Sequence, residues 1–379
     1  MPSSQRVTVV FSDHDLRGEG HTGSAGNAPE ERKRLVQKAL RTSALCDFVC
    51  VNEPESSLVP LGSLAQDKGL LLFLENAWQL WTLEWKKKPN EQLKGVFCAA
   101  DVDCSSRDPP PFVPGFFAPR EPGQKPTSGV LGQACFYGMD KETPIHGSTL
   151  GALKWDLAVT KEATRKVTSG ETRVAYSQIT HPGHHAGHIS YGGFCFINHA
   201  AVAARLLQHA HFSRVAVIDV DFHSGNGTMA IFWNDPKVFF ASLHGDPEFE
   251  YPFNAGFVDQ VGGKGAEGTT MNIPLPGGTD WPTYKQALKK VIDRVKAFGA
   301  EALVVSLGVD TLRGDPVALP FTRFCLDPID FKEMGEMLLF KDLRLPTVVI
   351  QEGGYKLDDV PLAITAFLTG SLVDKRSFL

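Results

Sequence analysis

The chain has 379 residues, and its 38 Lys and Arg against 43 Asp and Glu give a formal net charge of −5. Hydrophobic residues make up 42 % and charged residues 21 %, a balance that excludes wholesale disorder, and the mild acidic excess argues against a general nucleic-acid binder. No run approaches the roughly 18 apolar residues of a membrane span, and the N-terminus lacks the apolar core of a signal peptide, so a cytoplasmic protein is expected.

The first half of the chain shows few regular patterns. Residues 7–11 predict a strand, and residues 70–85 predict a helix whose tryptophans pack in the core. Cys46 and Cys50 lie in an apolar run and are interpreted as small buried hydrophobic residues, because cytosolic thiols stay reduced. A proline-rich stretch from 105 to about 130 predicts a loop that forms a rim or an interface.

The second half alternates continuous apolar strands with amphipathic helices. The predicted strands are 173–179, 214–219, 237–243, 303–307 and 347–351, and the predicted helices are 198–211, 283–298, 328–341 and 360–372. Gly299 is expected to end the second of these helices. This order predicts an α/β fold with a mostly parallel sheet and helices on both faces. With no repeat or linker in the chain, we expect one domain over residues 1–379.

Polar and ionisable residues follow five successive predicted strands, at the edge where parallel sheets bind ligands. Asp221 and His223 are two residues apart in an extended segment, so their side chains project to the same side. Asp310 follows a neighbouring strand and can join them. Two carboxylates and one imidazole leave a fourth zinc position open, as in catalytic sites. The alternative is that both acids cap helices and that His223 is a hydrogen-bonded loop residue.

The adjacent His184 and His185 are candidates for proton transfer, because an imidazole titrates near neutral pH. Asp219 and Asn226 flank the proposed metal segment and can orient the two rings. A ring held by an anion favours imidazolium, and a ring held by an amide keeps a lower pKa. The alternative is a surface histidine pair.

Tyr355 follows two glycines at the last predicted strand end. A phenol at this edge can donate a hydrogen bond to a developing oxyanion. The alternative is an aromatic residue that packs at a strand end.

These motifs, in this order, resemble those of the histone deacetylase superfamily, and most closely the acetylpolyamine amidohydrolases. The similarity covers nearly the whole chain and is strongest over residues 175–372. The matching runs are His-Pro-Gly-His-His-Ala-Gly (181–187), Gly-Gly-Phe-Cys-Phe-Ile-Asn (192–198), Asp-Val-Asp-Phe-His-Ser-Gly-Asn-Gly-Thr (219–228), Ala-Ser-Leu-His-Gly-Asp-Pro (241–247), Ser-Leu-Gly-Val-Asp-Thr (306–311) and Glu-Gly-Gly-Tyr (352–355).

The resemblance implies the arginase/deacetylase fold and a set of site residues. The implied ligands of Zn²⁺, or of Fe²⁺, are Asp221, His223 and Asp310, and the implied catalytic residues are His184, His185 and Tyr355. Asp219 and Asn226 would support the two histidines, and Gly193, Phe194 and Tyr251 would line a narrow substrate tunnel. A structural K⁺ would be held by Asp219, Asp221, His223, Ser242 and Leu243.

The reaction implied by the resemblance is hydrolysis of an acetylated amine to acetate and free amine. Zinc and Tyr355 would polarise the amide carbonyl, and His185 would take a proton from the attacking water. A protonated histidine would then donate to the leaving amine. The expected partner is a small acetylated amine such as an acetylpolyamine, with no nucleic acid or membrane partner.

The chain also departs from the family pattern. Thr180 and His181 stand where Arg-Pro is usual, so the loop beneath the site is expected to be less rigid or differently charged. Ser224 replaces a histidine that is not a zinc ligand. Leu131 stands where polyamine-selective relatives carry an acidic residue, which puts polyamine preference in question. The segment 21–31 also differs from the usual loop. The proline-rich segment lies where relatives make a dimer contact, so a homodimer is expected.

Three alternatives remain open from the sequence. The first is a protein lysine deacetylase, the second is a catalytically inactive acyl-binding scaffold, and the third is a manganese ureohydrolase. The ureohydrolase is the least favoured, because the stretch from Asp310 to Asp315 does not offer the acidic spacing of a two-metal site.

Overall fold

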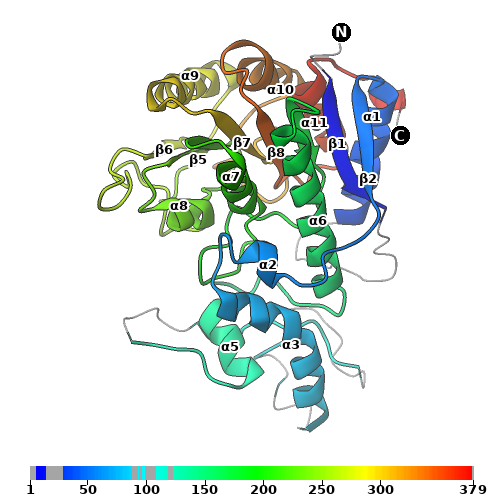
Figure 1. The fold of residues 1–379 in the computed structure, drawn as a ribbon, viewed down its shortest axis with the longest axis vertical. Helices are drawn as coiled ribbons and strands as arrows, with labels where there is room; N and C mark the ends of the chain where they lie inside the picture. The colour runs from blue at the N-terminus through cyan, green and yellow to red at the C-terminus, as the bar shows by residue number, and fades with distance from the viewer. Residues whose placement is uncertain are drawn as a thin grey trace.

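The structure is a computed structural model that describes residues 6–13, 29–87, 93, 96–98, 108–117 and 123–377. Eight strands form one sheet in the order β2-β1-β3-β8-β7-β4-β5-β6, and every neighbouring pair is parallel (Figure 1). The strands are β1 (Val7–Ser12), β2 (Cys46–Val51), β3 (Val174–Ser177), β4 (Val215–Asp219), β5 (Val238–Gly245), β6 (Thr270–Leu275), β7 (Ala302–Leu307) and β8 (Thr347–Gln351). The predicted parallel α/β sheet is confirmed.

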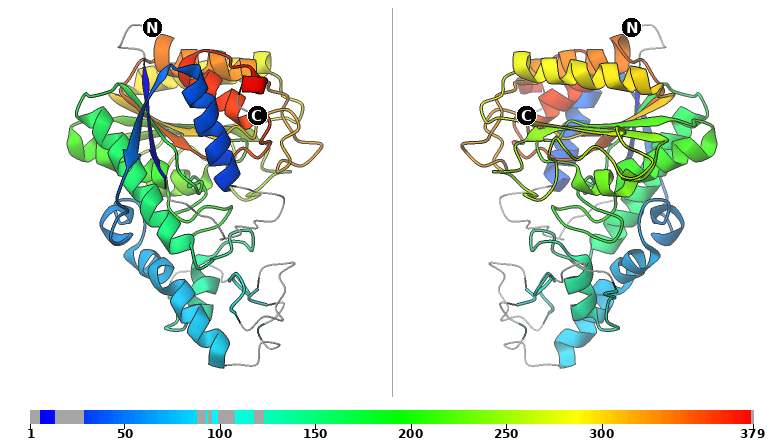
Figure 2. Two further views of the ribbon diagram at one scale, coloured as in Figure 1. Left: turned by 90° about the vertical axis from the view of Figure 1, so that its right-hand side faces the viewer. Right: turned by 90° about the vertical axis from the view of Figure 1, so that its left-hand side faces the viewer.

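Helices cover both faces of this sheet (Figure 2). One face packs against α6 (Thr149–Thr168), α7 (His199–Ala210) and α8 (Asn226–Phe232). The other packs against α1 (Pro29–Ser43), α9 (Trp281–Phe298), α10 (Pro328–Gly335), the π-helix Glu336–Lys341 and α11 (Val360–Thr369), with a short 3₁₀ turn at Lys375–Ser377. Among the described helices, none has the length and apolar character that a bilayer crossing requires.

The central strands are apolar on both sides because both faces of the sheet are covered. In β4, Val215 and Val217 face the helices α6 and α7, whereas Ala216 and Ile218 face the layer that contains α9 and α11. This alternation follows from the two-residue period of a strand. Because both faces are buried, the strand needs no polar face, and its apolar residues follow one another without interruption in the sequence.

The two edge strands were missed by the sequence prediction. β2 and β6 are only partly buried, and a polar residue interrupts each of them (Asp47 in β2 and Asn272 in β6), so neither segment was recognised as a strand. Cys46 is buried as predicted, but Cys50 lies half-exposed on the β2 edge, and its interpretation as a buried residue is wrong.

Two predicted helix ends are informative. Gly299 ends α9 in the left-handed conformation with φ 72°, as predicted. The helix predicted over 328–341 changes at Gly335 from α10 into a π-helix. The backbone of α11 passes so close there that a Cβ at Gly335 would lie 2.0 Å from the carbonyl oxygen of Phe367, and a sequence period does not report this contact.

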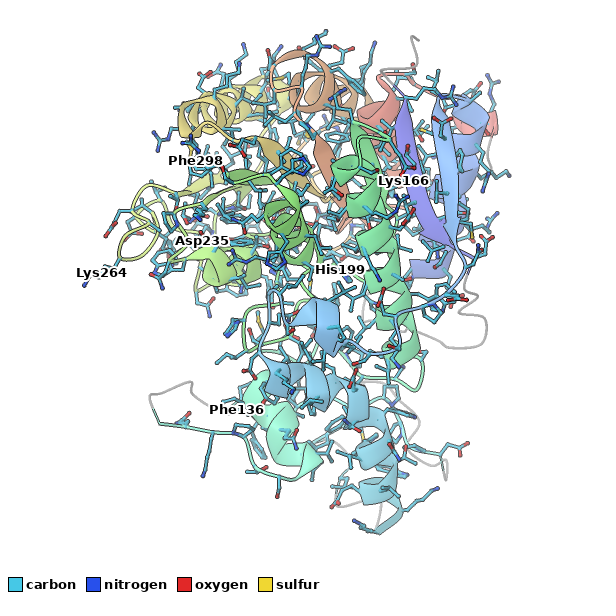
Figure 3. The ribbon with its side chains drawn as sticks, in the orientation of Figure 1. Phe136, Lys166, His199, Asp235, Lys264 and Phe298 are labelled. Carbon is cyan, nitrogen blue, oxygen red and sulfur yellow. The ribbon has the colours of Figure 1, made fainter. Side chains whose placement is uncertain are left out.

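The helices α2 (Val59–Gly62), α3 (Lys68–Lys87) and α5 (Val130–Tyr137) extend away from the sheet, with Phe136 among them (Figure 3). The described part of the proline-rich loop packs here. The ring of Phe112 stacks on Trp81 with centroids 4.6 Å apart, and the Trp81 indole donates to the carbonyl of Pro110 at 2.8 Å. The predictions made for residues 21–28, 105–107 and 118–122 concern positions outside the described residues.

Candidate active site and metal centre

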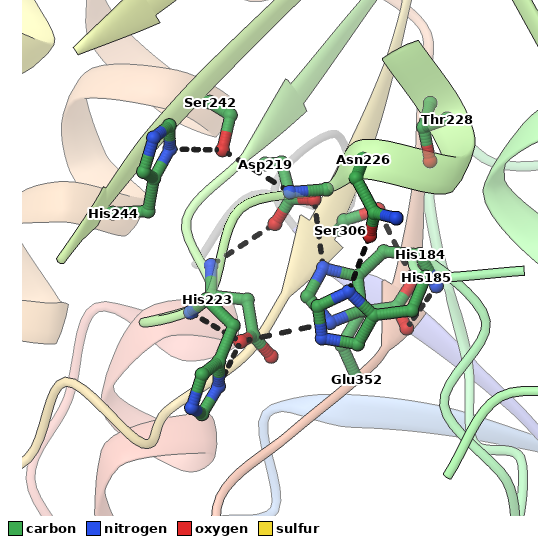
Figure 4. Close-up of polar contacts among 12 residues, drawn as sticks. His184, His185, Asp219, His223, Asn226, Thr228, Ser242, His244, Ser306 and Glu352 are labelled. Atoms are coloured by element: carbon green, nitrogen blue, oxygen red, sulfur yellow. Dashed lines mark hydrogen bonds and ion pairs between the residues drawn. The ribbon is translucent and has the colours of Figure 1, made fainter. Parts of the chain in front are cut away.

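Four adjacent strands deliver the predicted site residues to one edge of the sheet. His184 and His185 follow β3, Asp221 and His223 follow β4, Asp310 follows β7, and Tyr355 follows β8. Because β3, β8, β7 and β4 are neighbours and all parallel, their carboxyl ends meet (Figure 4). The structure therefore brings together residues that are up to 171 positions apart in the chain.

Asp221, His223 and Asp310 form a compact buried cluster whose candidate ligand atoms lie within 4.8 Å of one another. The His223 Nδ1 atom lies 3.1 Å from Asp310 Oδ2 and 3.4 Å from Asp221 Oδ1. Burial opposes the charged imidazole, but the two carboxylates outweigh it and raise the pKa of His223 to about 10. Two carboxylates and one imidazole in an anionic pocket fit a divalent cation such as Zn²⁺ or Fe²⁺.

Glycines allow the strand ends to approach Asp221 closely. A Cβ at Gly308 would lie 2.0 Å from Asp221 Oδ2, and one at Gly353 would lie 2.6 Å from the same atom. The Gly353 N–H donates to Asp221 Oδ2 at 2.9 Å, and the Phe222 N–H donates to Asp310 Oδ1 at 2.8 Å. The acid positions are therefore set by backbone groups, which cannot change rotamer.

The two histidines have different partners, as the sequence interpretation expected. His184 Nδ1 lies 3.0 Å from Asp219 Oδ2. Burial disfavours its charge, but the carboxylates of Asp221 and Asp219 hold the pKa of His184 well above its usual value. His185 Nδ1 lies 2.7 Å from the amide oxygen of Asn226. An amide oxygen can only accept, so Nδ1 carries the proton and Nε2 is an open acceptor. Burial, then the neighbouring histidines, hold the pKa of His185 well below its usual value.

A cavity of about 510 Å³ opens above these groups. It is lined by Glu142, Pro182, His184, His185, Gly193, Phe194, Asp221, His223, Glu250, Tyr251, Phe253, Pro316, Val317, Leu319 and Tyr355. Both aromatic pairs are edge-on: the ring centroids of Tyr355 and Phe194 lie 5.9 Å apart, and those of Tyr251 and His185 lie 4.8 Å apart. Burial raises the pKa of the Tyr355 phenol well above its usual value, so the hydroxyl keeps its proton and can donate it in a hydrogen bond.

Of the residues predicted for a monovalent cation, Asp221 and His223 belong to the metal cluster, and the other three lie on β4 and β5. Ser242 is paired with Asp219 in the β4–β5 register, and Leu243 follows it. Asp219 Oδ1 accepts the Asp221 N–H at 3.1 Å, and Ser242 Oγ lies 2.7 Å from His244 Nδ1. The cation itself stays a prediction.

Glu352 has a position that the sequence interpretation did not use, although it begins the Glu-Gly-Gly-Tyr motif. Its buried Oε2 accepts the N–H groups of Gly183 at 2.6 Å and His184 at 3.2 Å, and Oε1 accepts the Ser306 hydroxyl at 3.1 Å. Its ligand atom also lies near those of His184 and Cys195. Because protein donors occupy both oxygens, Glu352 acts as a hydrogen-bond acceptor rather than as part of a second metal site.

Arg32 was also missed, because it lies on α1, a helix that the sequence pattern did not predict. Its buried guanidinium donates to the carbonyl groups of Glu352 at 3.1 Å, Gly354 at 3.2 Å and Thr180 at 3.3 Å. It thus joins the segment before Tyr355 to the loop that carries the histidines. No local motif signals this role.

The unusual Thr180-His181 pair is anchored from below. Buried Asp156 on α6 accepts the N–H groups of Thr180 at 2.7 Å and His181 at 3.2 Å, and its Oδ2 lies 3.1 Å from His181 Nδ1. These contacts tie the loop to α6. Leu131 packs half-buried against the core and is not among the cavity-lining residues, whereas Glu142 lines the cavity.

Comparison with known proteins shows the class of protein to which this fold and site belong. The model of the histone deacetylase domain matches residues 87–371. The chain is 36 % identical over 371 residues to the acetylpolyamine amidohydrolase of Mycoplana ramosa, covering 96 % of this chain and 99 % of that one. It is 35 % identical over 303 residues to acetylpolyamine amidohydrolase 2 of Pseudomonas aeruginosa, covering 80 % of each.

A solved structure shows the same fold. The crystal structure of the acetylpolyamine aminohydrolase from Burkholderia pseudomallei matches with a TM-score of 0.78 and 30 % identity, covering 96 % of this chain and 98 % of that one. The chain therefore belongs to the histone deacetylase family and has the arginase/deacetylase fold. These relationships support a deacetylase-type amidohydrolase.

Proposed function

We propose that this protein is a zinc-dependent amidohydrolase that removes the acetyl group from a small linear amine, such as an acetylated diamine or polyamine. One observation carries the proposal. The Asp221–His223–Asp310 cluster, the two differently held histidines and the Tyr355 phenol all meet at the inner end of one cavity. The names of its relatives point to the same substrate class.

The chemistry divides among the residues by their charge and their partners. A divalent ion held by Asp221, His223 and Asp310 would supply Lewis acidity toward a carbonyl and toward water. His185, neutral and with Nε2 open, suits the general base, and His184, held as imidazolium, suits electrostatic support. The Tyr355 hydroxyl would donate to the oxyanion as the amide carbon becomes tetrahedral. A proton held on a histidine would then pass to the leaving amine.

An acidic side chain at the cavity mouth favours a substrate with a positive charge. Glu142 lines the mouth with an exposed carboxylate, and so offers an acidic group from a different position than Leu131. A positive group at the far end of a linear substrate would be attracted to this carboxylate. The missing acid at Leu131 therefore does not exclude a diamine or polyamine substrate.

A turnover screen of the metal-loaded protein tests the proposal. It compares acetylated diamines and polyamines, an acetyl-lysine peptide and a guanidine substrate, with His185→Ala as the control. We expect the small acetylated amines to be hydrolysed best, and His185→Ala to lower kcat by about 10²- to 10⁴-fold. Faster peptide turnover would favour a protein deacetylase, and metal binding without any turnover would favour an acyl-binding scaffold. Light scattering would test the expected homodimer.

A further inference from the structure

Asp315 has a buried carboxylate to which three backbone N–H groups donate. Its Oδ2 accepts the N–H of Tyr355 at 2.7 Å and the N–H of Lys356 at 3.1 Å, and its Oδ1 accepts the N–H of Val317 at 3.1 Å. Tyr355 and Val317 both line the cavity, whereas Asp315 is not among the lining residues. One carboxylate therefore holds the backbone at two places on the cavity wall.

A tight turn places this carboxylate. The Asp315 N–H donates to the carbonyl of Leu312 at 3.0 Å, and the intervening Gly314 has a φ of 78°, which glycine adopts without strain. The Lys356 ammonium also donates to the carbonyl of Arg313, in the same turn, at 2.8 Å. Three hydrogen bonds thus join the turn to the segment that follows β8.

Tyr355 needs such a restraint because two glycines precede it. The chain leaves β8 at Gln351, and Gly354 has a φ of 120°, a conformation that residues with a side chain rarely adopt. Arg32 holds the carbonyl of Gly354, and Asp315 holds the next N–H along the chain. A displacement of about 1 Å at a group that acts in the transition state can cost roughly 100-fold in rate. The hydroxyl of Tyr355 would therefore lose its effect if this backbone moved.

We propose that Asp315 is a positioning residue for the hydrolysis: it fixes the Tyr355 hydroxyl where the oxyanion develops, and through Val317 it fixes a second part of the cavity wall. The inference rests on the proposed function. A carboxylate can serve both places because each of its two oxygens accepts hydrogen bonds. An amide has one acceptor and one donor, so it can satisfy the N–H groups of Tyr355 and Lys356, or that of Val317, and not both.

The test compares Asp315→Ala with Asp315→Asn on an acetylated diamine. Asp315→Ala removes both connections, so kcat should fall roughly 10- to 100-fold while the metal content stays unchanged. Asp315→Asn can direct its oxygen to Tyr355 and Lys356, so it should recover kcat to within about threefold of the wild type. Its amide would then face the Val317 N–H, so KM should rise about three- to tenfold. Equal kcat in the two variants, or a loss of metal that accounts for the loss of rate, would overturn the proposal.

A Tyr355→Phe background separates positioning of the phenol from a general loss of structure. Without the hydroxyl, Asp315→Ala should lower the residual kcat by no more than about threefold, and a loss as large as in the wild-type background would overturn the positioning role. The control is Asp235→Ala. Asp235 likewise accepts an N–H two residues on, that of Lys237 at 2.9 Å, but it pairs with Arg205 and does not line the cavity. The control should retain kcat, and a loss as large as in Asp315→Ala would also overturn the role.

Hydrogen exchange on the wild-type protein needs neither a variant nor turnover. The Tyr355 and Lys356 amides should exchange far more slowly than the amide of exposed Gly265. Exchange as fast as at Gly265 would overturn the positioning role, even if Asp315→Ala fails to fold. Failure of the wild type to hydrolyse any acetylated amine would instead refute the proposed function.

Discussion

The floor and the mouth of the cavity are built in opposite ways. The floor residues Asp221, Asp310 and His184 come from strand ends, are buried, and are held by backbone N–H groups and carboxylates. At the mouth, Phe253 is 57 % exposed and Leu319 is 40 % exposed, and both come from loops. The comparison teaches that the chemical groups depend on the sheet for their positions, whereas the recognition surface can vary without disturbing it.

The largest expected effect lies in the floor. Asp310→Asn keeps the side-chain shape but removes one negative ligand, so kcat should fall by more than the roughly 100-fold that is typical for loss of a supporting residue. Metal content, measured on the same samples, should fall with it. Asp327→Asn, at an exposed carboxylate paired with Arg313, is the matched control and should retain both. Full metal content and activity in Asp310→Asn would refute the assigned metal centre.

A smaller effect is expected one layer beneath the floor. Glu352→Ala would leave the N–H groups of Gly183 and His184 without acceptors, so the free energy of unfolding should fall by about 2–4 kcal/mol and kcat by roughly 10- to 100-fold. Glu352→Gln can present its oxygen to these N–H groups and its amide to Ser306, so it should recover most of both. Denaturation and steady-state kinetics would check this, and equal behaviour of Ala and Gln would contradict it.

Acid should lower the contribution that two buried histidines away from the cavity mouth make to the free energy of unfolding. Burial lowers the pKa of His199 and of His244 to about 4, from 6.5. Between these values each of these two histidines binds more protons in the unfolded chain than in the folded one, so its contribution to the free energy of unfolding should fall as the pH drops from about 6.5 towards 4. Burial raises the pKa of Glu352 to about 7, and this group contributes with the opposite sign. The slope approaches 1.4 kcal/mol per pH unit for each histidine. Denaturation at several pH values would measure it, and His199→Gln should reduce the slope. The same slope in His199→Gln as in the wild type would contradict the prediction.

The smallest effect is expected at the mouth. Phe253→Ser and Leu319→Ser remove exposed apolar surface, so the free energy of unfolding should change by no more than about 0.5 kcal/mol. KM should rise by about fivefold or less with kcat unchanged, because a partly exposed side chain contributes roughly 1 kcal/mol of contact. Kinetics on the best acetylated amine would show this. A loss of kcat as large as in the floor variants would end the distinction between the two regions.

Much of the floor was predictable because its residues are local to strand ends. Asp221 and His223 are separated by one residue, and His184 and His185 are adjacent, so both pairs can be recognised from their spacing in the sequence. The apolar runs of β4 and β7 likewise reported a sheet buried on both faces. Arg32, Asp156 and Asp315 could not be found this way, because each acts on backbone groups of a distant segment and belongs to no motif.

The sequence by itself therefore determined the parallel α/β architecture, the family resemblance and the candidate ligands and histidines, since strand periodicity and short spacings encode them. Only the tertiary structure decided which oxygens hold each histidine, that Glu142 rather than residue 131 brings a carboxylate to the mouth, and that Asp315 holds the backbone of Tyr355. The physical reason is that these contacts depend on distances between strand ends and loops, and those distances arise only when the sheet assembles.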